Sequence, residues 1–296
     1  MGPSGAGKSS LMNALAGFRS EATGTLIVNG CEHPLRYGAT IMPVIGNYVL
    51  QDDFLFPQLT VRESLNFAAC MKLPSQVNTK GERDRMIKVL LDRLGLVEVA
   101  SRRIDRLSGG QKKRLSVALE LINYPPVLFL DEPTSGLDSF SSYKLIRLLK
   151  DLTKAGCNVI CTIHQPNSKM FHMFDTLFVL AKGGRCAYQG PAAHLVEYMR
   201  ICHLPVCPPH VNPADFVFEG DHIDKLYSAG KSVPSDVHNL LGTSSGYQNR
   251  KVQPKKSYLK RMEAIDIISH PLYQNDLPKL PHPHGKAPKF DDLTVV

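Results

Sequence analysis

Gly2-Pro3-Ser4-Gly5-Ala6-Gly7-Lys8-Ser9 opens the chain with a glycine-rich turn that leads into a helix-forming stretch. Such a turn directs backbone N–H groups from a helix start toward phosphate oxygens, and glycine lets the backbone approach the ligand closely. We expect Lys8 to neutralise the β and γ phosphates of ATP and the Ser9 hydroxyl to bind Mg²⁺. The predicted nucleotide-binding residues of this turn are Gly2, Ser4, Gly5, Gly7, Lys8, Ser9 and Ser10.

A pair of carboxylates follows the apolar run 127–130, which reads Val-Leu-Phe-Leu. A carboxylate at the C-terminal end of a buried strand can hold Mg²⁺ through water, and its neighbour can orient and deprotonate an attacking water. We therefore assign Asp131 to the metal and Glu132 to the general base.

The composition bounds the class of protein. The chain has 296 residues, 43% of them hydrophobic, with seven cysteines and a formal net charge of +8. These figures exclude a disulfide scaffold, a collagen-like repeat and wholesale disorder. No apolar run reaches the roughly 18 residues needed to cross a bilayer, and no secretory signal is visible, so we expect free thiols. The basic residues are spread along the chain and the run 112–114 suits a solvated helix face, so we expect no nucleic-acid partner.

The order of apolar and polar segments predicts an α/β fold with a parallel-sheet core, and the phosphate-binding turn at residues 2–9 indicates the P-loop NTPase type. Short apolar runs at 127–130, 158–162 and 176–180 suit strands buried on both faces. Helical spacing predominates at about 61–120, which predicts a helical insert. We expect an ATP-binding domain over residues 1–220 and a mostly irregular, Pro- and Lys-rich tail over 221–296. Tyr258, Met262, Ile265 and Ile268 have helical spacing and could form a transient helix there.

A second glycine motif, Leu107-Ser108-Gly109-Gly110-Gln111, lies in the sequence between the glycine turn and the carboxylate pair. With it the chain resembles the nucleotide-binding domain of ABC transporters, whose signature motif has this sequence. Ser108 and the N–H groups of Gly109 and Gly110, at a helix N-terminus, can bind a γ-phosphate. The resemblance implies that Ser108, Gly109, Gly110 and Gln111 bind the nucleotide held by an opposite subunit, so that two such domains meet head to tail.

Three further positions match family landmarks. Gln51 resembles the glutamine that senses Mg²⁺ and the γ-phosphate, Asp138 resembles the aspartate of the loop that crosses the dimer interface, and His164 resembles the switch histidine that helps to place the water. The resemblance thus adds Gln51 and His164 to the catalytic set, Gln51 to the metal ligands and Asp138 to the nucleotide site. Taken singly, they could be a loop amide, a helix cap and an ordinary strand-end histidine.

Finer likeness points to the White-type, or G, subfamily of half-transporters. It is carried by His164-Gln165-Pro166, by Ala187-Tyr188-Gln189-Gly190 and by Asn212-Pro213-Ala214-Asp215-Phe216, and it covers residues 2 to about 220. The resemblance implies an ATPase on the cytoplasmic face of a membrane that powers export of a lipid, sterol or other hydrophobic substrate. It also implies a second half-transporter as partner and a transmembrane domain supplied by the intact chain.

The sequence departs from this pattern at its start, because only Met1 precedes Gly2. The strand before the P-loop and the aromatic residue that stacks on adenine are missing, and we expect the loop to lack an anchor. We interpret Met1 as an internal methionine of a longer protein, with the membrane domain beyond residue 296. Two rivals remain: a soluble ABC ATPase, and a catalytically impaired fragment that only dimerises with or regulates an intact half-transporter. Cys202, His203, Cys207 and His210 could also bind zinc, although a Pro-rich connector suits their spacing better.

Overall fold

The computed structural model describes residues 1–28, 31–35, 46–74, 78–231 and 293–295. Its centre is a parallel sheet in the order β3 (Gly46–Val49), β4 (Val127–Leu130) and β5 (Asn158–Cys161). All four residues of β4 are buried, as expected for a strand with a neighbour on each side. The residues of β5 are only half-buried, contrary to the prediction, because β5 is at the edge of this sheet. The parallel α/β core is confirmed.

A second, two-stranded sheet lies beside the first. The predicted strand at 176–180 is present as β6 (Thr176–Ala181), but its strand partner is the antiparallel β7 (Arg185–Pro191). Gly183 and Gly184 join the two with positive φ angles of 78° and 74°. This glycine turn reverses the chain at once, so the run that follows β5 does not continue the parallel sheet.

The glycine turn at the start of the chain is anchored to β6, which corrects our expectation. The amino group of Met1 donates to the Phe178 carbonyl at 2.6 Å, and the Leu180 N–H donates to the Met1 carbonyl at 2.8 Å. Gly2 is buried against the same strand, where an added Cβ would come within 2.6 Å of the Leu180 carbonyl oxygen. Met1 thus takes the place of a parallel neighbour of β6 and fixes where the turn begins.

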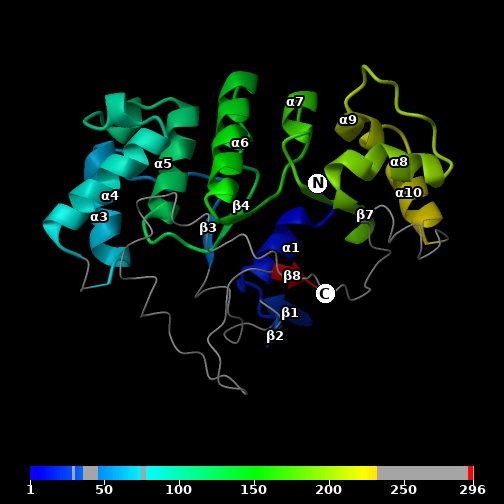
Figure 1. Ribbon diagram of the computed structural model, residues 1–296, viewed down its shortest axis with the longest axis horizontal. Helices are drawn as coiled ribbons and strands as arrows, with labels where there is room; N and C mark the ends of the chain where they lie inside the picture. The colour runs from blue at the N-terminus through cyan, green and yellow to red at the C-terminus, as the bar shows by residue number, and fades with distance from the viewer. Residues whose placement is uncertain (29–30, 36–45, 75–77, 232–292, 296) are drawn as a thin grey trace.

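The predicted helical insert is confirmed and forms one side of the molecule (Figure 1). Thr60 caps its first helix by a reciprocal bond with Glu63, and a single apolar cluster of buried residues joins the insert to the central sheet. The elements are α3 (Val61–Lys72), α4 (Lys80–Arg93), η1 (Val97–Val99), η2 (Ile104–Arg106) and α5 (Gly109–Leu121).

The lysine and arginine run of α5 is not the solvated face that the sequence suggested. Lys113 is 3% exposed and Arg114 donates to the carbonyls of Leu94 and Gly95 at 2.9 and 3.2 Å. The apolar positions of α5 leave these two side chains pointing at neighbouring loops rather than at water. Cations can be buried in this way because backbone carbonyls and, for Lys113, the Asp53 carboxylate accept their donors.

The remaining helices complete the layers around the sheets. In Figure 1, α6 and α7 stand between the insert and a C-terminal group of helices, and α1 lies below the sheet. Residues of α10 pack on β7, so the packed part of the chain continues past residue 220 to Gly230. These elements are α1 (Lys8–Leu15), α6 (Ser139–Lys154), α7 (Ser168–Phe171), η3 (Ala192–His194), α8 (Leu195–Ile201), α9 (Pro213–Phe218) and α10 (His222–Gly230).

A small antiparallel sheet lies below α1 in Figure 1. Its strands are β2 (Cys31–Pro34), β1 (Thr25–Val28) and β8 (Leu293–Val295), in that order. The last three described residues of the predicted tail are therefore strand. The possible helix at Tyr258, Met262, Ile265 and Ile268 lies outside the described residues. The division of the chain at residue 220 stays a prediction.

Candidate functional site

The carboxyl ends of the parallel strands meet at one edge of the central sheet. The Asp131 N–H donates to the Val49 carbonyl and the Thr162 N–H donates to the Leu130 carbonyl, both at 3.0 Å. The residues that follow β3, β4 and β5 are therefore neighbours, although about 30 to 80 positions separate them in the chain. Such an edge is where open α/β sheets bind ligands.

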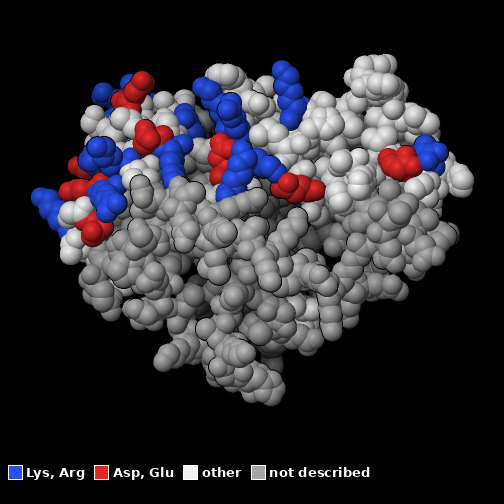
Figure 2. Space-filling model, in the orientation of Figure 1, with Lys and Arg blue, Asp and Glu red and all other residues white. Residues whose placement is uncertain are grey.

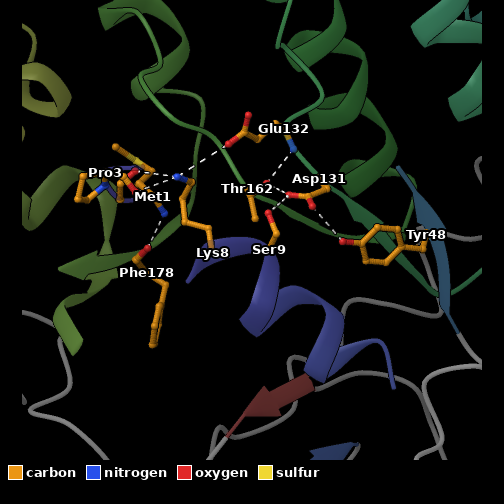
Figure 3. Close-up of polar contacts among 10 residues, drawn as sticks. Met1, Pro3, Lys8, Ser9, Tyr48, Asp131, Glu132, Thr162 and Phe178 are labelled. Carbon is orange, nitrogen blue, oxygen red and sulfur yellow. Dashed lines mark hydrogen bonds and ion pairs between the residues drawn. The ribbon is translucent and has the colours of Figure 1, made fainter. Parts of the chain in front are cut away.

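The glycine turn lies beside this edge and leads into α1, which lies below the carboxylates in Figure 3. Gly5 and Gly7 have φ angles of 74° and 90°, and Gly7 is the N-cap of α1. An added Cβ at Gly5 would meet no atom within 4 Å, so glycine is required there by the backbone conformation. No side chain caps α1, which leaves the N–H groups of its first turn available to an anion.

Lys8 lies between the turn and the carboxylates. Its ammonium donates to the carbonyls of Gly2 and Pro3 at 3.0 and 3.1 Å and lies 3.9 Å from Glu132 Oε1. The side chain is only 7% exposed. This cation is held at the mouth of the turn, beside the backbone donors that the sequence assigned to phosphate.

Asp131 is the centre of the polar network. Its Oδ1 accepts from the Ser9 hydroxyl at 3.0 Å and from the Thr162 hydroxyl at 2.5 Å, and its Oδ2 lies 3.4 Å from the Tyr48 hydroxyl. Burial and the Asp131 carboxylate raise the pKa of Tyr48. The site thus joins the start of α1 to the ends of three strands.

Sequence reasoning missed Thr162 and Tyr48. The register of β4 and β5 aligns Leu130 with Cys161, so the next residues, Asp131 and Thr162, are side by side. A parallel pairing of the two predicted strands was therefore a signal that could have identified Thr162. Tyr48 carried no comparable signal, because an aromatic residue near a strand end is ordinary.

Glu132 is held in an unusual backbone conformation, with φ at 42°. A residue with a side chain there costs of order 1–3 kcal/mol, and such strain is concentrated at functional sites. The Glu132 N–H donates to Thr162 Oγ1 at 2.7 Å, which fixes the strained peptide. The same hydroxyl that donates to Asp131 therefore sets the direction of the Glu132 side chain toward Lys8 (Figure 3).

The donor set fits Mg²⁺ and a polyphosphate. Ser9 and Asp131 offer hard oxygen ligands 3.0 Å apart, and adjacent ligands of an octahedral Mg²⁺ are about 3 Å apart. The cation of Lys8 and the free N–H groups of the first turn of α1 suit the phosphates. The residues present are therefore compatible with ATP and Mg²⁺.

Gln51 and His164 lie on loops that leave the same sheet edge, and both side chains are exposed. Within the described part of the chain, neither side chain has a hydrogen bond. The main chain of Gln51 is held instead, because its carbonyl accepts from the Lys113 ammonium at 2.8 Å. The structure places these two residues near the site without fixing their side chains.

Ser108 and its neighbours lie elsewhere, at the N-terminus of α5. Ser108 caps the helix in a reciprocal bond with Gln111, at 2.9 and 3.3 Å. Gly110 faces the start of α6, where an added Cβ would lie 3.1 Å from Ser141. Of the described contacts, no hydrogen bond or ion pair joins residues 108–111 to residues 2–10.

Asp138 is the N-cap of α6, the ordinary role that the sequence left open. Its carboxylate accepts from the N–H groups of Phe140 and Ser141 at 3.0 and 2.9 Å. Hydrogen bonds from Ser141 hold the pKa of Asp138 below its usual range. Asp138 thereby faces the same corner of the molecule as the tip of α5, and its part in a nucleotide site stays a prediction.

Three other features were considered from the sequence, namely a zinc site, a membrane span and a basic surface patch. The described residues contain no group of three or more His, Cys, Asp or Glu residues arranged to hold a metal, although Cys202 and Cys207 are buried. No helix among them combines the length and apolar character needed to cross a bilayer. On the face shown in Figure 2, basic and acidic side chains are interspersed over α3–α6 rather than segregated by sign.

Comparison with known proteins agrees with the geometry. The model of the family described as ABC transporter matches residues 1–135, and that of the ABC-2 type transporter matches residues 164–241. A dimeric ATP-binding cassette solved in a post-hydrolysis state, bound to ADP and Pi, is 27% identical with a TM-score of 0.52. It covers 62% of this chain, and the match spans 80% of the solved chain.

Several curated proteins are similar to this chain. They include Protein scarlet of Drosophila melanogaster (43% identical over 73% of the chain), ABC transporter G family member 13 of Arabidopsis thaliana (40% over 94%) and the broad substrate specificity ATP-binding cassette transporter ABCG2 of Rattus norvegicus (38% over 78%). The chain spans 33%, 38% and 36% of their respective lengths. The likeness reaches past residue 220, where the sequence had shown us no match.

Proposed function

As a member of the G-type ABC transporter family this chain carries an ATP-binding cassette, and we propose that it hydrolyses ATP to power export of a lipid, sterol or other hydrophobic molecule. One observation carries the proposal. Lys8, Ser9, Asp131 and Glu132 converge at the carboxyl edge of the parallel sheet and are linked there through Thr162. A cation, a hydroxyl and two carboxylates in this order suit phosphoryl transfer to water.

Each residue has a part in that chemistry. The N–H groups at the start of α1 and the Lys8 ammonium would bind the β- and γ-phosphates. Ser9 and Asp131 would hold Mg²⁺, which neutralises phosphate charge when bound. Glu132 would take a proton from the attacking water, since its carboxylate lies on the Lys8 side of Asp131.

The loop residues complete the proposed site. Gln51 would contact Mg²⁺ and the γ-phosphate, and His164 would help to place the water. Both side chains are exposed, so they can turn toward a ligand. Catalytic side chains of this kind often reach their partners only in the loaded complex.

A second protomer would supply the rest of the site. Ser108 and Gly109 to Gln111 lie at a helix N-terminus where Ser108 and Gly109 are exposed, and the contacts of the two glycines with Leu137 and Ser141 place Asp138 beside them. We propose that this tip binds the γ-phosphate held by a second half-transporter, as a homodimer or heterodimer. The solved cassette to which this chain is similar is dimeric, which supports an assembly of two protomers. We further propose that the cassette works on the cytoplasmic face of a membrane, coupled to a transmembrane domain of the intact protein.

The test is Glu132→Gln in the complete transporter. We expect ATP binding to be retained and phosphate release to fall by at least a hundredfold, because the amide cannot accept the proton. Glu197→Gln is the matched control, since Glu197 pairs with Arg200 on the distant α8. Near wild-type turnover in Glu132→Gln would remove Glu132 as the base.

The same assay separates the rival interpretation. An impaired fragment that only dimerises or regulates predicts no ATP hydrolysis by the 296-residue chain alone, and no added hydrolytic site when it is mixed with a full-length partner. The substrate class is tested in proteoliposomes, where ATP-dependent movement of a labelled sterol or phospholipid should disappear in Glu132→Gln. Transport of hydrophilic solutes alone would contradict the proposed class.

A further inference from the structure

Lys113 is a buried cation that the proposed mechanism does not use. It lies on the second turn of α5, five residues after Ser108, and is 3% exposed. Lys112, the preceding residue, is only half-buried. A lysine buried to this degree needs a partner for each of its donors, because an unpaired ammonium is costly away from water.

The partners of Lys113 all belong to the segment after β3. Its ammonium lies 2.7 Å from Asp53 Oδ1, 2.8 Å from the Gln51 carbonyl and 3.2 Å from the Leu50 carbonyl. These three contacts account for the three donors of an ammonium. Asp53 Oδ1 also accepts from the Ser116 hydroxyl of α5 at 2.8 Å. One helix therefore holds this segment through a cation and a hydroxyl.

The segment has few other means of support. Leu50 is 50% exposed, Phe54 is 80% exposed, and the side chains of Gln51 and Asp52 are also exposed. Asp53 alone of residues 50–54 turns its side chain inward, and it does so toward α5. The backbone position of Gln51 thus depends on Lys113 more than on packing of the loop itself.

We propose that Lys113 is a positioning residue that ties the Gln51 loop to the helix whose tip is Ser108. The inference rests on the proposed function, in which Gln51 serves the protomer's own nucleotide and Ser108 serves the partner's. These two elements belong to different sites, yet within one protomer the ammonium that holds the Gln51 carbonyl belongs to α5, about one and a half helical turns after Ser108. Binding of the partner's nucleotide at the N-terminus of α5 would then position Gln51 at the nucleotide of its own protomer.

The first measurement is hydrogen exchange on the nucleotide-free full chain. In Lys113→Met, amides of residues 50–55 should exchange at least tenfold faster, while those of residues 2–12 stay unchanged. Lys112→Met is the matched control and should leave both segments as in the wild type. Lys113→Arg keeps a cation that can donate to the same carbonyls and should restore most of the protection.

The second measurement is steady-state ATPase activity of the complete protein. Lys113→Met should lower kcat at least tenfold with the KM for ATP within twofold, and should raise the Mg²⁺ concentration needed for half-maximal rate. A purely structural role predicts parallel losses in nucleotide binding and turnover. Should Lys113→Met fail to fold, Asp53→Asn and Ser116→Ala weaken the same connection, and must raise exchange in residues 50–55 and lower kcat to a smaller degree.

The outcomes separate the two proposals. If the wild-type protein hydrolyses ATP, and Lys113→Met gives the same exchange and the same kinetics as Lys112→Met, the positioning role alone is overturned. A wild-type protein that neither binds nor hydrolyses ATP would overturn the proposed function, and the catalytic half of this inference with it. Faster loop exchange with unchanged kcat would show an anchor that catalysis does not need, which also overturns the proposal.

Discussion

The two glycine-rich segments of this chain, residues 2–9 and 108–111, lie at the N-termini of α1 and α5 but use their polar groups in different ways. At the first, Ser9 bonds to Asp131 across 122 positions of sequence, and Lys8 reaches Glu132. At the second, the side chain of Ser108 bonds to Gln111 only three residues away. One segment is integrated into a site within its own protomer, and the other closes on itself and leaves its tip exposed.

The second segment, residues 108–111, is by itself an incomplete binding site. A helix N-terminus whose cap is satisfied locally can still present its free N–H groups outward, but among the described residues no hydrogen bond or ion pair joins residues 108–111 to the first segment. The first segment has a cation, a hydroxyl and carboxylates around it. The proposed shared site assigns the second segment to another protomer's nucleotide, so changes at the two segments should have separable effects.

Lys8→Met should give the largest effect, on nucleotide affinity. Methionine keeps most of the length of the side chain and removes the charge that faces the phosphates, so we expect the Kd for ATP to rise at least a hundredfold, or about 2.8 kcal/mol. Titration of a fluorescent ATP analogue into the full chain measures this. Lys169→Met on α7, where the side chain is exposed, is the control. Unchanged affinity in Lys8→Met would mean that the first segment is not a phosphate site.

Ser108→Arg should separate binding from turnover. The arginine removes the capping hydroxyl and places a bulky cation at the positive end of α5, so a second protomer could not seat its nucleotide there. We expect an unchanged Kd for ATP with turnover at least tenfold lower. ATP-dependent dimerisation in a Glu132→Gln background, followed by light scattering, should be lost.

The control for the tip of α5 is Ser108→Thr, which keeps a hydroxyl able to cap the helix. Its turnover should stay within a few fold of the wild type. If Ser108→Arg weakened ATP binding as much as Lys8→Met does, the two segments would serve one site within a single protomer. The distinction between the regions would then be lost.

Much of the core could be predicted because local sequence determined it. The strand at 127–130 has the predicted bounds, since four consecutive apolar residues between a Pro pair and a carboxylate pair suit only a buried strand. Asp131 and Ser9 lie together, as expected from two motifs at the same sheet edge. The roles of the site residues remain predictions until they are measured.

The features that escaped prediction depend on contacts distant in sequence. The run 112–114 has the composition of a solvated helix face, and only the position of the Gln51 loop shows why Lys113 is buried. Met1 pairs with β6 across 177 positions, which no local pattern encodes. Thr162 is intermediate, because strand register points to it once β4 and β5 are known to be neighbours.

Thr162→Val tests whether the hydrogen bonds that link Asp131 and Glu132 through Thr162 matter for catalysis, and we expect a smaller effect than those above. Valine has nearly the same shape but leaves Asp131 with one fewer donor and the Glu132 N–H without its acceptor. The Asp131 carboxylate keeps the Ser9 hydroxyl as a donor, so the Glu132 N–H is the one group left unsatisfied. An unsatisfied buried group costs about 1–3 kcal/mol, and the free energy of unfolding should fall by about that amount. We also expect kcat to fall about tenfold, because Glu132 loses the bond that holds its strained peptide.

Urea denaturation and phosphate release on the same preparations measure both effects of Thr162→Val. Thr162→Ser keeps the hydroxyl and should restore kcat to within about threefold of the wild type, although it loses a methyl group. A valine variant with wild-type kcat and lowered stability would reduce Thr162 to a structural residue. The hydrogen bonds of Thr162 would then contribute to the stability of the fold and not to catalysis.

Glycine to alanine changes at the tip of α5 should have the smallest effects. Alanine favours a helix over glycine by up to about 1 kcal/mol, and at Gly109 the added Cβ would make an ordinary contact, 3.5 Å from Leu137. At Gly110 it would lie 3.1 Å from Ser141 and offset that gain. We expect Gly109→Ala to raise the free energy of unfolding slightly and Gly110→Ala to leave it within about 1 kcal/mol of the wild type. Because stability is nearly unaffected, any large loss of ATP-dependent dimerisation in these variants reports the exposed tip itself. Equal dimerisation in both variants and the wild type would show that a partner's nucleotide does not approach the α5 backbone closely.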